Sequence, residues 1–216
     1  MPRESHEERR KRAGRIAKLL ARSYPDVRTA LRFSNPFELL VATILSAQCT
    51  DKKVNEVTAV LFRSYGTPQR LAAAEPAAIE AIVHPTGFYR QKAKSIQSVA
   101  RDLVERFGGK VPDRLEDLVG LRGVARKTAN VVLGSAFGIP GIAVDTHMLR
   151  VNRRLGLTAS DDPEQVERDL MALLPEREWI DWTQRVIHHG RVCCVARRPR
   201  CDECPLAGEC PEGAKR

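Results

Sequence analysis

Apolar residues recur at intervals of three and four along most of the chain, whereas strict alternation of apolar and polar residues is almost absent. The first spacing puts apolar side chains on one face of an α-helix, and the second would put them on one face of a strand. Residues 91–107 show the helical spacing most clearly, with Gly108-Gly109 as a terminator and an apolar face made of Ala93, Ile96, Val99, Leu103 and Phe107. The pattern therefore predicts an all-α fold.

Capping and stop signals divide the rest of the chain into further helices. Ser34-Asn35-Pro36 predicts the start of an apolar helix, and Gly66 predicts the end of the next one. The expected helices cover residues 8–23, 36–45, 51–65, 76–83, 91–107, 113–119, 126–137, 145–155, 163–174 and 178–191. A break at residues 138–141, which contain Pro140-Gly141, separates two parts. We expect the two parts to pack closely and to leave a groove between them.

The charge balance narrows the class of partner. The 216 residues include 36 Lys and Arg against 27 Asp and Glu, which gives a net charge of +9 and a pI near 9.6. This balance favours a polyanion, and nucleic acid ranks above a membrane surface because the basic residues are spread along the chain. No apolar run approaches the roughly 18 to 20 residues that span a bilayer, and the first ten residues lack the apolar core of a secretory signal. We expect a cytoplasmic, DNA-associated protein and no membrane partner.

The strongest candidate for chemistry is a lysine and an aspartate set eighteen positions apart. Lys127 follows the small and apolar tripeptide Gly123-Val124-Ala125, a turn that can aim backbone N–H groups at one DNA phosphate. Lys127 falls in the first turn of the next helix, where the helix dipole and Arg126 both disfavour an ammonium. A partly neutral lysine can attack a sugar carbon and form a Schiff base, and Asp145 would supply negative charge. Since the two residues flank the break, the groove is where they could meet.

Each of these residues also has an ordinary interpretation. A lysine at a helix start in a basic chain is usually a phosphate contact or a solvated side chain, and Asp145, followed by Thr-His-Met-Leu, is a good helix N-cap. Taken singly, each residue favours the ordinary interpretation. Together with the hairpin and the cysteines described next, they favour catalysis.

Four cysteines near the carboxyl end have the density of a metal centre. Cys194, Cys201, Cys204 and Cys210 are separated by six, two and five residues. A structural zinc site usually uses two paired C-x-x-C knuckles, whereas this segment has one pair flanked by single cysteines, so a [4Fe-4S] cluster fits better. Ligand type alone leaves zinc open, because thiolates suit both metals.

The loop between the first two of these cysteines is basic. Arg197, Arg198 and Arg200 lie within it, and a loop closed by a metal centre could present them to phosphates. A solvated basic loop is the ordinary alternative. Cys193 is adjacent to a predicted ligand and cannot easily reach the same centre, and Cys49 is more typical of a small core residue than of a reactive thiol.

Taken together, the segments 121–129 and 144–147 and the cysteine spacing resemble the endonuclease III family of DNA glycosylases. The segment 45–51 and the loop Thr86-Gly87-Phe88-Tyr89 match that family's pattern as well. The resemblance implies two helical domains flanking a DNA-binding cleft. Residues 29–139 would form a six-helix barrel containing the helix-hairpin-helix, and residues 1–28 plus 140–216 would form the iron–sulfur cluster domain.

The resemblance also implies an activity and a role for each residue. The protein would be a base excision repair glycosylase that removes oxidised pyrimidines such as thymine glycol, with an AP lyase activity that cuts 3′ to the abasic site by β-elimination. Lys127 would attack C1′ and Asp145 would stabilise the developing positive charge. Gln48 and Phe88 resemble wedges that fill and open the base stack, although Gln48 could instead cap its helix and Phe88 could be core. The expected partner is double-stranded DNA with oxidised pyrimidines or abasic sites, and we expect a monomer.

The hairpin departs from the family pattern at one position. The family usually has Gly-Val-Gly where this chain has Gly123-Val124-Ala125. If that third position needs positive φ, alanine costs about 1 kcal/mol and shifts the amides that bind phosphate.

Two rival functions stay open. A relative that removes mismatched adenine typically lacks the hairpin lysine and uses a glutamate near the Gln48 segment, which makes it the weaker rival. A non-catalytic DNA-binding module with a structural zinc belongs to a different class and predicts no covalent chemistry.

Overall fold

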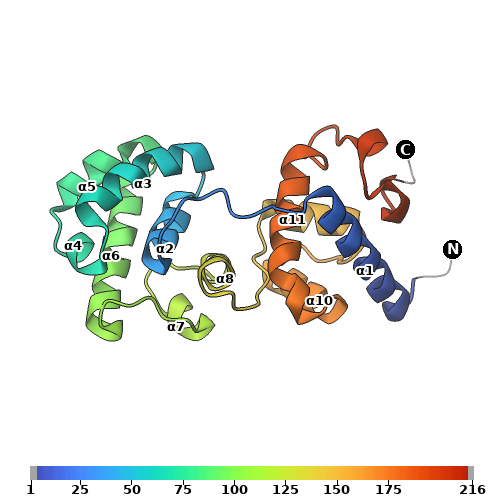
Figure 1. Cartoon of the computed structure of the whole chain (residues 1–216), viewed down its shortest axis with the longest axis horizontal. Coiled ribbons are helices and arrows are strands. Elements are labelled where there is room, and N and C mark those ends of the chain that lie inside the picture. The colour runs from blue at the N-terminus through green and yellow to red at the C-terminus, as the bar shows by residue number, and fades with distance from the viewer. Residues whose placement is uncertain (1–3, 214–216) are drawn as a thin grey trace. The chain divides into compact units, whose positions relative to one another are not determined.

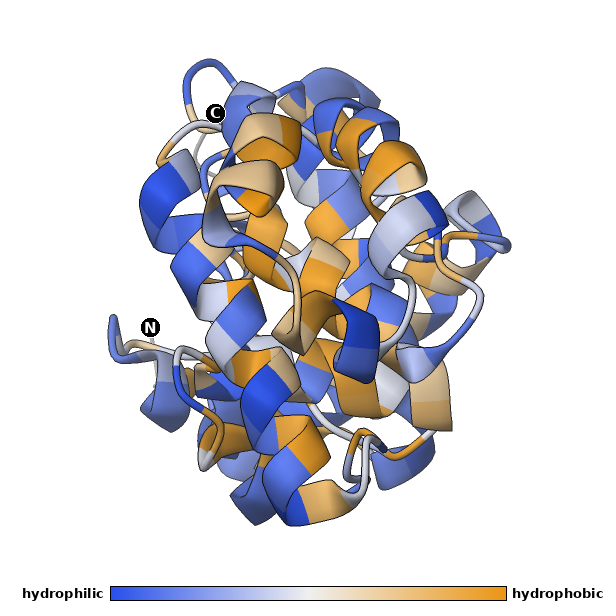
Figure 2. Ribbon diagram, turned by 90° about the vertical axis from the view of Figure 1, so that its left-hand side faces the viewer, coloured by the Kyte–Doolittle hydropathy of each residue, from blue (hydrophilic) through white to orange (hydrophobic). Residues whose placement is uncertain are grey.

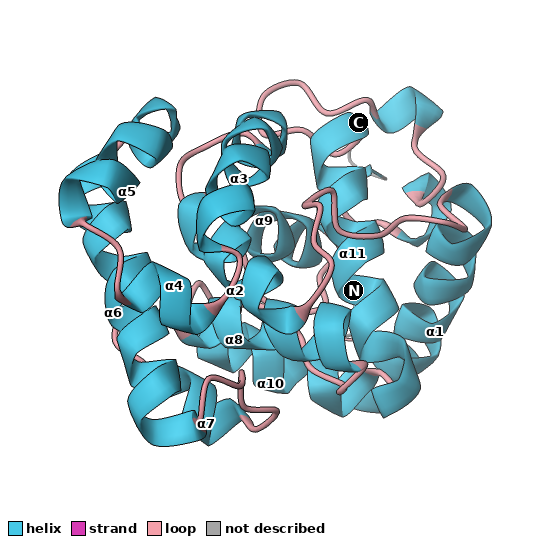
Figure 3. Cartoon of the chain, turned by 60° about the vertical axis from the view of Figure 1, so that its left-hand side comes forward, coloured by secondary structure: helices cyan, strands magenta, loops and turns pink. Residues whose placement is uncertain are grey.

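The computed structural model describes residues 4–213 of the 216-residue chain. Its regular structure consists of helices and short helical turns, with no strand among the described residues (Figure 3). The predicted all-α fold is therefore confirmed. Within the same range, no helix is both long and apolar enough to cross a membrane.

The chain divides into two compact units. We call residues 29–139 the middle unit, and residues 1–28 with 140–216 the terminal unit, of which residues 1–3 and 214–216 lie outside the description. Figure 1 labels most of their helices. Each unit has its own apolar core.

The middle unit is an assembly of helices around one buried helix. Every residue of α2 from Leu39 to Leu45 is buried, so protein surrounds this segment on all sides. The long helix α6 packs against α4 and α5, and α2 packs against α8. The elements are α2 (Pro36–Leu45), α3 (Asp51–Tyr65), α4 (Pro68–Ala72), α5 (Pro76–Val83), η1 (His84–Thr86), α6 (Tyr89–Phe107), α7 (Leu115–Val119), α8 (Arg126–Val132) and η2 (Leu133–Phe137).

Helices α4 and α8 of the middle unit differ from the prediction. Helix α4 was not expected, because its five residues are too few to show a helical period. It is nonetheless capped by the Thr67 side chain, which accepts from the amide of Arg70 at 3.3 Å. The helix predicted over residues 126–137 is α-helical only to Val132 and continues as the π-helical turn η2, which ends at Gly138 with φ +68°.

The terminal unit joins the amino-terminal helix to the carboxyl-terminal part of the chain. Helix α1 packs against α10 and α11, and α11 packs against α9. Hydrophobic residues, orange in Figure 2, recur along the helices of the terminal unit as they do along those of the middle unit. The elements are α1 (His6–Ser23), α9 (Thr146–Arg154), α10 (Pro163–Leu173), η3 (Glu176–Glu178), α11 (Trp179–Val192), η4 (Cys201–Glu203) and η5 (Ala207–Glu209).

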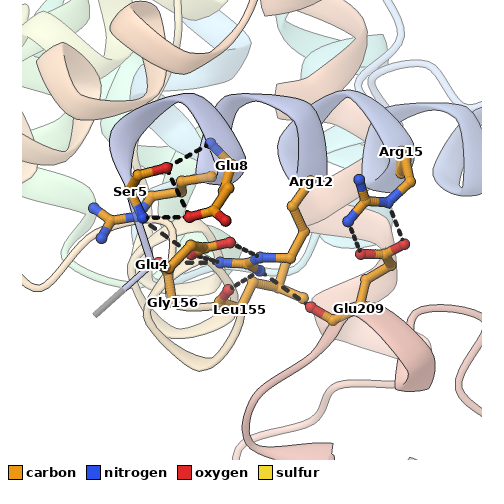
Figure 4. A network of polar contacts seen from close by, with 9 residues as sticks. Glu4, Ser5, Glu8, Arg12, Arg15, Leu155, Gly156 and Glu209 are labelled. Carbon is orange, nitrogen blue, oxygen red and sulfur yellow. Dashed lines mark hydrogen bonds and ion pairs between the residues drawn. The ribbon is translucent and has the colours of Figure 1, made fainter. Parts of the chain in front are cut away.

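A buried arginine fastens α1 to two distant turns of the terminal unit (Figure 4). Nη1 of Arg12 donates to the carbonyl oxygens of Leu155 at 2.6 Å and Glu209 at 3.1 Å. Nε and Nη2 of Arg12 donate to the two carboxylate oxygens of Glu4 at 2.7 and 2.8 Å. The Arg12 guanidinium holds the pKa of Glu4 below its usual range. Arg12 thus pairs with a carboxylate and also satisfies carbonyl groups that would otherwise be buried without a donor.

Replacing Arg12 with methionine tests how much these hydrogen bonds contribute to stability. The substitution keeps the aliphatic stem but leaves the carbonyls of Leu155 and Glu209 without their donor, so the terminal unit should lose about 1–3 kcal/mol of unfolding free energy. Both tryptophans of the chain, Trp179 and Trp182, lie in this unit, so urea unfolding followed by tryptophan fluorescence reports on it.

Arg15 provides the matched control, because it lies on the same helix and pairs with Glu209 at 2.6 Å while its side chain is 56% exposed. Arg15→Met should leave the urea midpoint unchanged, since exposed ion pairs contribute little. Equal shifts for the two variants would contradict the assignment.

Candidate functional site

The hairpin between α7 and α8 contains one residue with left-handed backbone. Gly123 has φ +86°, and the amide of Val124 donates to the Leu121 carbonyl at 3.1 Å. The Val124 side chain is buried in the middle unit's core and so anchors the hairpin. Ala125 is the N-cap of α8 and forms no side-chain cap. The amino end of α8, residues 125–127, is therefore exposed, and its N-cap residue forms no side-chain bond to the helix.

Ala125 does not carry the strain that the sequence comparison made conditional on positive φ. Its φ is −79° and its ψ is 159°, an extended conformation that any residue adopts. The positive φ falls instead on Gly123. The departure from Gly-Val-Gly thus lies at a position where alanine is unstrained.

Lys127 and Asp145 each lie at the start of a helix, in different units. Lys127 is the second residue of α8 and is exposed. Asp145 caps α9, because its Oδ1 accepts from the amides of His147 at 2.9 Å and Met148 at 2.8 Å. Oδ2 of Asp145 lies 3.2 Å from Nδ1 of His147, and the Asp145 side chain is 13% exposed.

The capping interpretation of Asp145 is therefore correct, but it does not exclude a role in chemistry. The two amides fix the carboxylate in one orientation, which is how a catalytic group is held ready. That Lys127 and Asp145 meet at one groove stays a prediction.

Gln48 and Phe88 are exposed residues with left-handed backbone. Gln48 has φ +52° and follows α2, and Phe88 has φ +48° and precedes α6. Phe88 is 69% exposed, so the core interpretation of this residue is wrong. The capping interpretation of Gln48 is also wrong, because Ser46 is the C-cap of α2 and Thr50 is the N-cap of α3.

Backbone strain in the described residues coincides with predicted DNA contacts. Only three non-glycine residues from 4 to 213 have positive φ, namely Gln48, Phe88 and Arg198. All three were assigned to DNA on sequence grounds. Each such residue costs about 1–2 kcal/mol and persists only where the surroundings hold it in place, which is typical of functional sites.

The cysteine segment surrounds a cavity in the terminal unit. This cavity of about 30 Å³, partly open to solvent, is lined by all four predicted ligands, Cys194, Cys201, Cys204 and Cys210, and also by Cys193. Arg154 of α9 donates from Nη1 to Sγ of Cys194 at 3.3 Å, and its carbonyl accepts from Sγ of Cys210 at 3.4 Å. Four cysteines that line one cavity beside a cationic donor form a donor set that suits an iron–sulfur cluster.

A second arginine on α9 helps to shape the basic loop that follows Cys194. Arg150 donates to the carbonyls of Gly190 at 2.8 Å and Cys194 at 3.2 Å, while Arg154 donates to those of Val195 and Ala196 at 2.8 and 2.9 Å. Arg197, Arg198 and Arg200 of the same loop are exposed. The loop is therefore held from inside by arginines that sequence reasoning missed. Their spacing of four residues, which puts them on one face of α9, is the signal that could have found them.

A buried histidine lies beside the cavity. His189 is 1% exposed, and its Nε2 lies 3.7 Å from Sγ of Cys204 while its Nδ1 lies 3.0 Å from the Tyr24 hydroxyl. Burial lowers the pKa of His189 to about 4 and raises the pKa of Tyr24 to about 12. The neutral ring can accept from Tyr24 and donate toward the sulfur. Nothing in the sequence indicated this contact, since the three residues come together only in the fold.

Exchanging alanine and glycine in the hairpin tests its backbone assignment. Gly123→Ala should destabilise the protein by about 1 kcal/mol because of its positive φ. Space is not the limit there, since a Cβ would lie 3.5 Å from Oγ of Ser95. Ala125→Gly, which restores the family's usual residue, should also destabilise by about 0.4–1 kcal/mol, because glycine adds freedom to the unfolded chain. Urea unfolding followed by far-ultraviolet circular dichroism measures both, and a stabilising Ala125→Gly would contradict the assignment.

Comparisons with known proteins agree with this arrangement. The family model for base excision DNA repair proteins of the HhH-GPD superfamily matches residues 41–176, and the model for the iron–sulfur binding domain of endonuclease III matches residues 194–210. Endonuclease III of Synechocystis is 51% identical, over 94% of this chain and 93% of that protein. Endonuclease III of Escherichia coli is 42% identical, over 88% and 90%.

Solved structures show the same likeness. A trapped endonuclease III–DNA covalent intermediate is 43% identical with a TM-score of 0.91, covering 95% of this chain and 97% of that one. A non-covalent endonuclease III–DNA complex gives 43% and 0.90. A thermostable thymine-DNA glycosylase, 21% identical with a TM-score of 0.85, shares the fold. The predictions of DNA binding and of a [4Fe-4S] cofactor are confirmed. The chain therefore belongs to the endonuclease III family of the HhH-GPD superfamily, and it is a base excision repair DNA glycosylase with AP lyase activity.

Proposed function

We propose that Lys127 is the nucleophile of this enzyme and that Asp145 is its catalytic carboxylate. The Lys127 amine attacks C1′ of the damaged nucleotide, and the base leaves with the electron pair of the glycosidic bond. Asp145 stabilises the positive charge that develops on the sugar and helps to activate the amine. The nitrogen then loses a proton, its lone pair forms the C1′=N bond of a protonated imine, and the C1′–O4′ bond breaks as O4′ takes up a proton. Removal of a C2′ proton then expels the 3′ phosphate by β-elimination and cuts the strand.

The main support is the exposed position of Lys127 in the first turn of α8, directly after a hairpin that can hold backbone phosphate. The fixed orientation of the Asp145 carboxylate also supports its role. Both amides bond to Oδ1, and Oδ2 lies next to Nδ1 of His147.

We further propose that the substrate is double-stranded DNA carrying an oxidised pyrimidine, such as thymine glycol, or an abasic site. Gln48 and Phe88 would enter the base stack when the damaged nucleotide leaves it. Phosphates would be held by the hairpin residues Gly123, Val124, Ala125 and Arg126 and by the loop arginines Arg197, Arg198 and Arg200. The protein would act as a monomer on the DNA of the cytoplasm, and the middle and terminal units would be the barrel domain and the cluster domain.

We propose that Cys194, Cys201, Cys204 and Cys210 hold the cluster and that Cys193 does not. Ligand atoms of His189, Cys193 and Cys204 lie within 4.8 Å of one another, so proximity alone would admit a different set. We favour the four spaced cysteines because all four line the cavity and lie within residues 194–210, the range that the iron–sulfur family model matches, whereas Cys193 lies outside that range. When bound, the cluster closes the basic loop of residues 195–200 and keeps it in shape.

Single substitutions separate these two ligand sets. Serine in place of Cys194, Cys201, Cys204 or Cys210 should remove most of the iron and the broad visible absorption from the purified protein, because each change removes a thiolate ligand. Cys193→Ala, the matched control, should keep both. Iron analysis and an absorption spectrum of each variant decide between the sets, and a colourless wild-type protein loaded with zinc would contradict the cluster site altogether.

Borohydride trapping on DNA with an abasic site tests the nucleophile, since only a Schiff base becomes a stable adduct. Lys127→Ala should lower the trapping rate by at least about a hundredfold. Trapping of this variant at the wild-type rate would contradict the assignment, and a wild-type protein that forms no adduct would favour the non-catalytic module.

Asp145→Asn separates the chemical role of Asp145 from its capping role. Asparagine caps helices as well as aspartate does, so thermal stability should stay the same. Base release, measured on duplex DNA with a single thymine glycol, should fall by about 10²–10³, because the charge near the sugar is lost. Unchanged base release in this stable variant would limit Asp145 to its structural role.

A further inference from the structure

Both proposed wedges have strained backbone and lie just beyond the end of a helical element. Gln48 lies three residues beyond the end of α2, and Phe88 lies two residues beyond the end of η1. Phe88 also follows Gly87, whose φ is +70°. Left-handed backbone at exposed, non-glycine residues requires neighbours that hold it in place. The two loops concerned are residues 46–50, between α2 and α3, and residues 87–88, between η1 and α6.

Lys92 contacts the residue that precedes each of these loops. Its Nζ donates to the carbonyl of Leu45 at 2.9 Å and to the carbonyl of Thr86 at 2.7 Å. Leu45 is the last residue of α2 and Thr86 is the last residue of η1. Carbonyls at helix ends lack partners within the helix and carry the negative end of its dipole, so a cation is favoured there.

The position of Lys92 is unusual for a lysine. Its side chain is 5% exposed, in the first turns of α6, in a chain whose other basic residues mostly face solvent. Burial lowers the pKa of this amine, so an apolar residue of the same length would be easier to accommodate. One buried amine here bonds to two carbonyls from different segments. Such an amine holds the two segments at a particular distance from each other.

Hydrogen bonds between residues that are close in the sequence shape each loop separately. Oγ1 of Thr86 donates to the Val83 carbonyl at 2.8 Å, and the amide of Lys92 donates to the Phe88 carbonyl at 3.0 Å. On the other side, the amide of Cys49 donates to the Ser46 carbonyl at 3.1 Å. These contacts stay within one loop or between one loop and α6, whereas the Lys92 amine joins both.

We propose that Lys92 is a positioning residue that fixes the separation of Gln48 and Phe88, so that both wedges enter the duplex together. The inference rests on the proposed function of these two residues. Lys92 acts through the loops and does not touch the DNA.

The test measures wedge insertion directly. A duplex carries a tetrahydrofuran abasic analogue, which the enzyme cannot cleave, with 2-aminopurine opposite it, and fluorescence rises when the 2-aminopurine is unstacked. Lys92→Met keeps the volume and removes the amine, and the fluorescence rise at saturating protein should fall to less than half of the wild-type rise. Lys94→Met is the matched control, since Lys94 is an exposed lysine on the same helix, and it should give the full rise.

A double-mutant cycle excludes a merely structural effect. If Lys92 acts through the wedge, Lys92→Met should slow single-turnover base release at least tenfold in the wild-type background. In the Phe88→Ala background it should slow release less than threefold. Effects that multiply independently would overturn the proposal, and so would a full fluorescence rise in Lys92→Met.

The outcomes also separate this proposal from the one on which it rests. If Phe88→Ala and Gln48→Ala leave the fluorescence rise intact, the wedge assignment itself fails. If they abolish the rise and Lys92→Met does not, only the positioning role fails. Should Lys92→Met fold poorly by circular dichroism, Lys92→Gln replaces it. Glutamine is too short to reach both carbonyls, so a full rise in that variant would overturn the proposal.

Discussion

The constraint on which the rest of this structure depends is that an amine can attack C1′ only after the nucleotide has left the base stack. Extrusion costs a few kcal/mol, which the protein has to offset through contacts made with the opened DNA. The middle unit places exposed, strained residues at the ends of tightly packed helices. Gln48 follows the buried helix α2, and Phe88 precedes the long helix α6. A rigid frame matters because a flexible loop would lose its ordering entropy at the moment of insertion.

The terminal unit meets a different demand, which is to present positive charge beside a thiolate-bound cluster. Arginines are used in two ways there. Arg150 and Arg154 point inward and hold the loop through its carbonyls, whereas Arg197 and Arg198 are exposed on that loop. The inward pair offsets the negative charge of the thiolates locally, so the outward residues stay available for the phosphate contacts that we propose for them.

The sequence predicted the helical segments well, because the spacing of apolar residues reflects the core directly, as in α6. It missed α4, which is shorter than the periods needed to detect it, and it left open whether Ala125 needs positive φ, because φ depends on how the hairpin packs. The candidate residues could be named from motifs. Their supports, Lys92 and His189 among them, could not be found, since a buried polar group is recognised only when its partners, distant in sequence, are in place.

The most direct test of the account locates the covalent bond itself. Wild-type protein is reduced with borohydride on DNA containing an abasic site, the adduct is digested with nuclease and protease, and the peptide that carries the sugar remnant is sequenced by mass spectrometry. The account predicts that the remnant is on Lys127. A remnant on the amino-terminal amine or on any other lysine would contradict it.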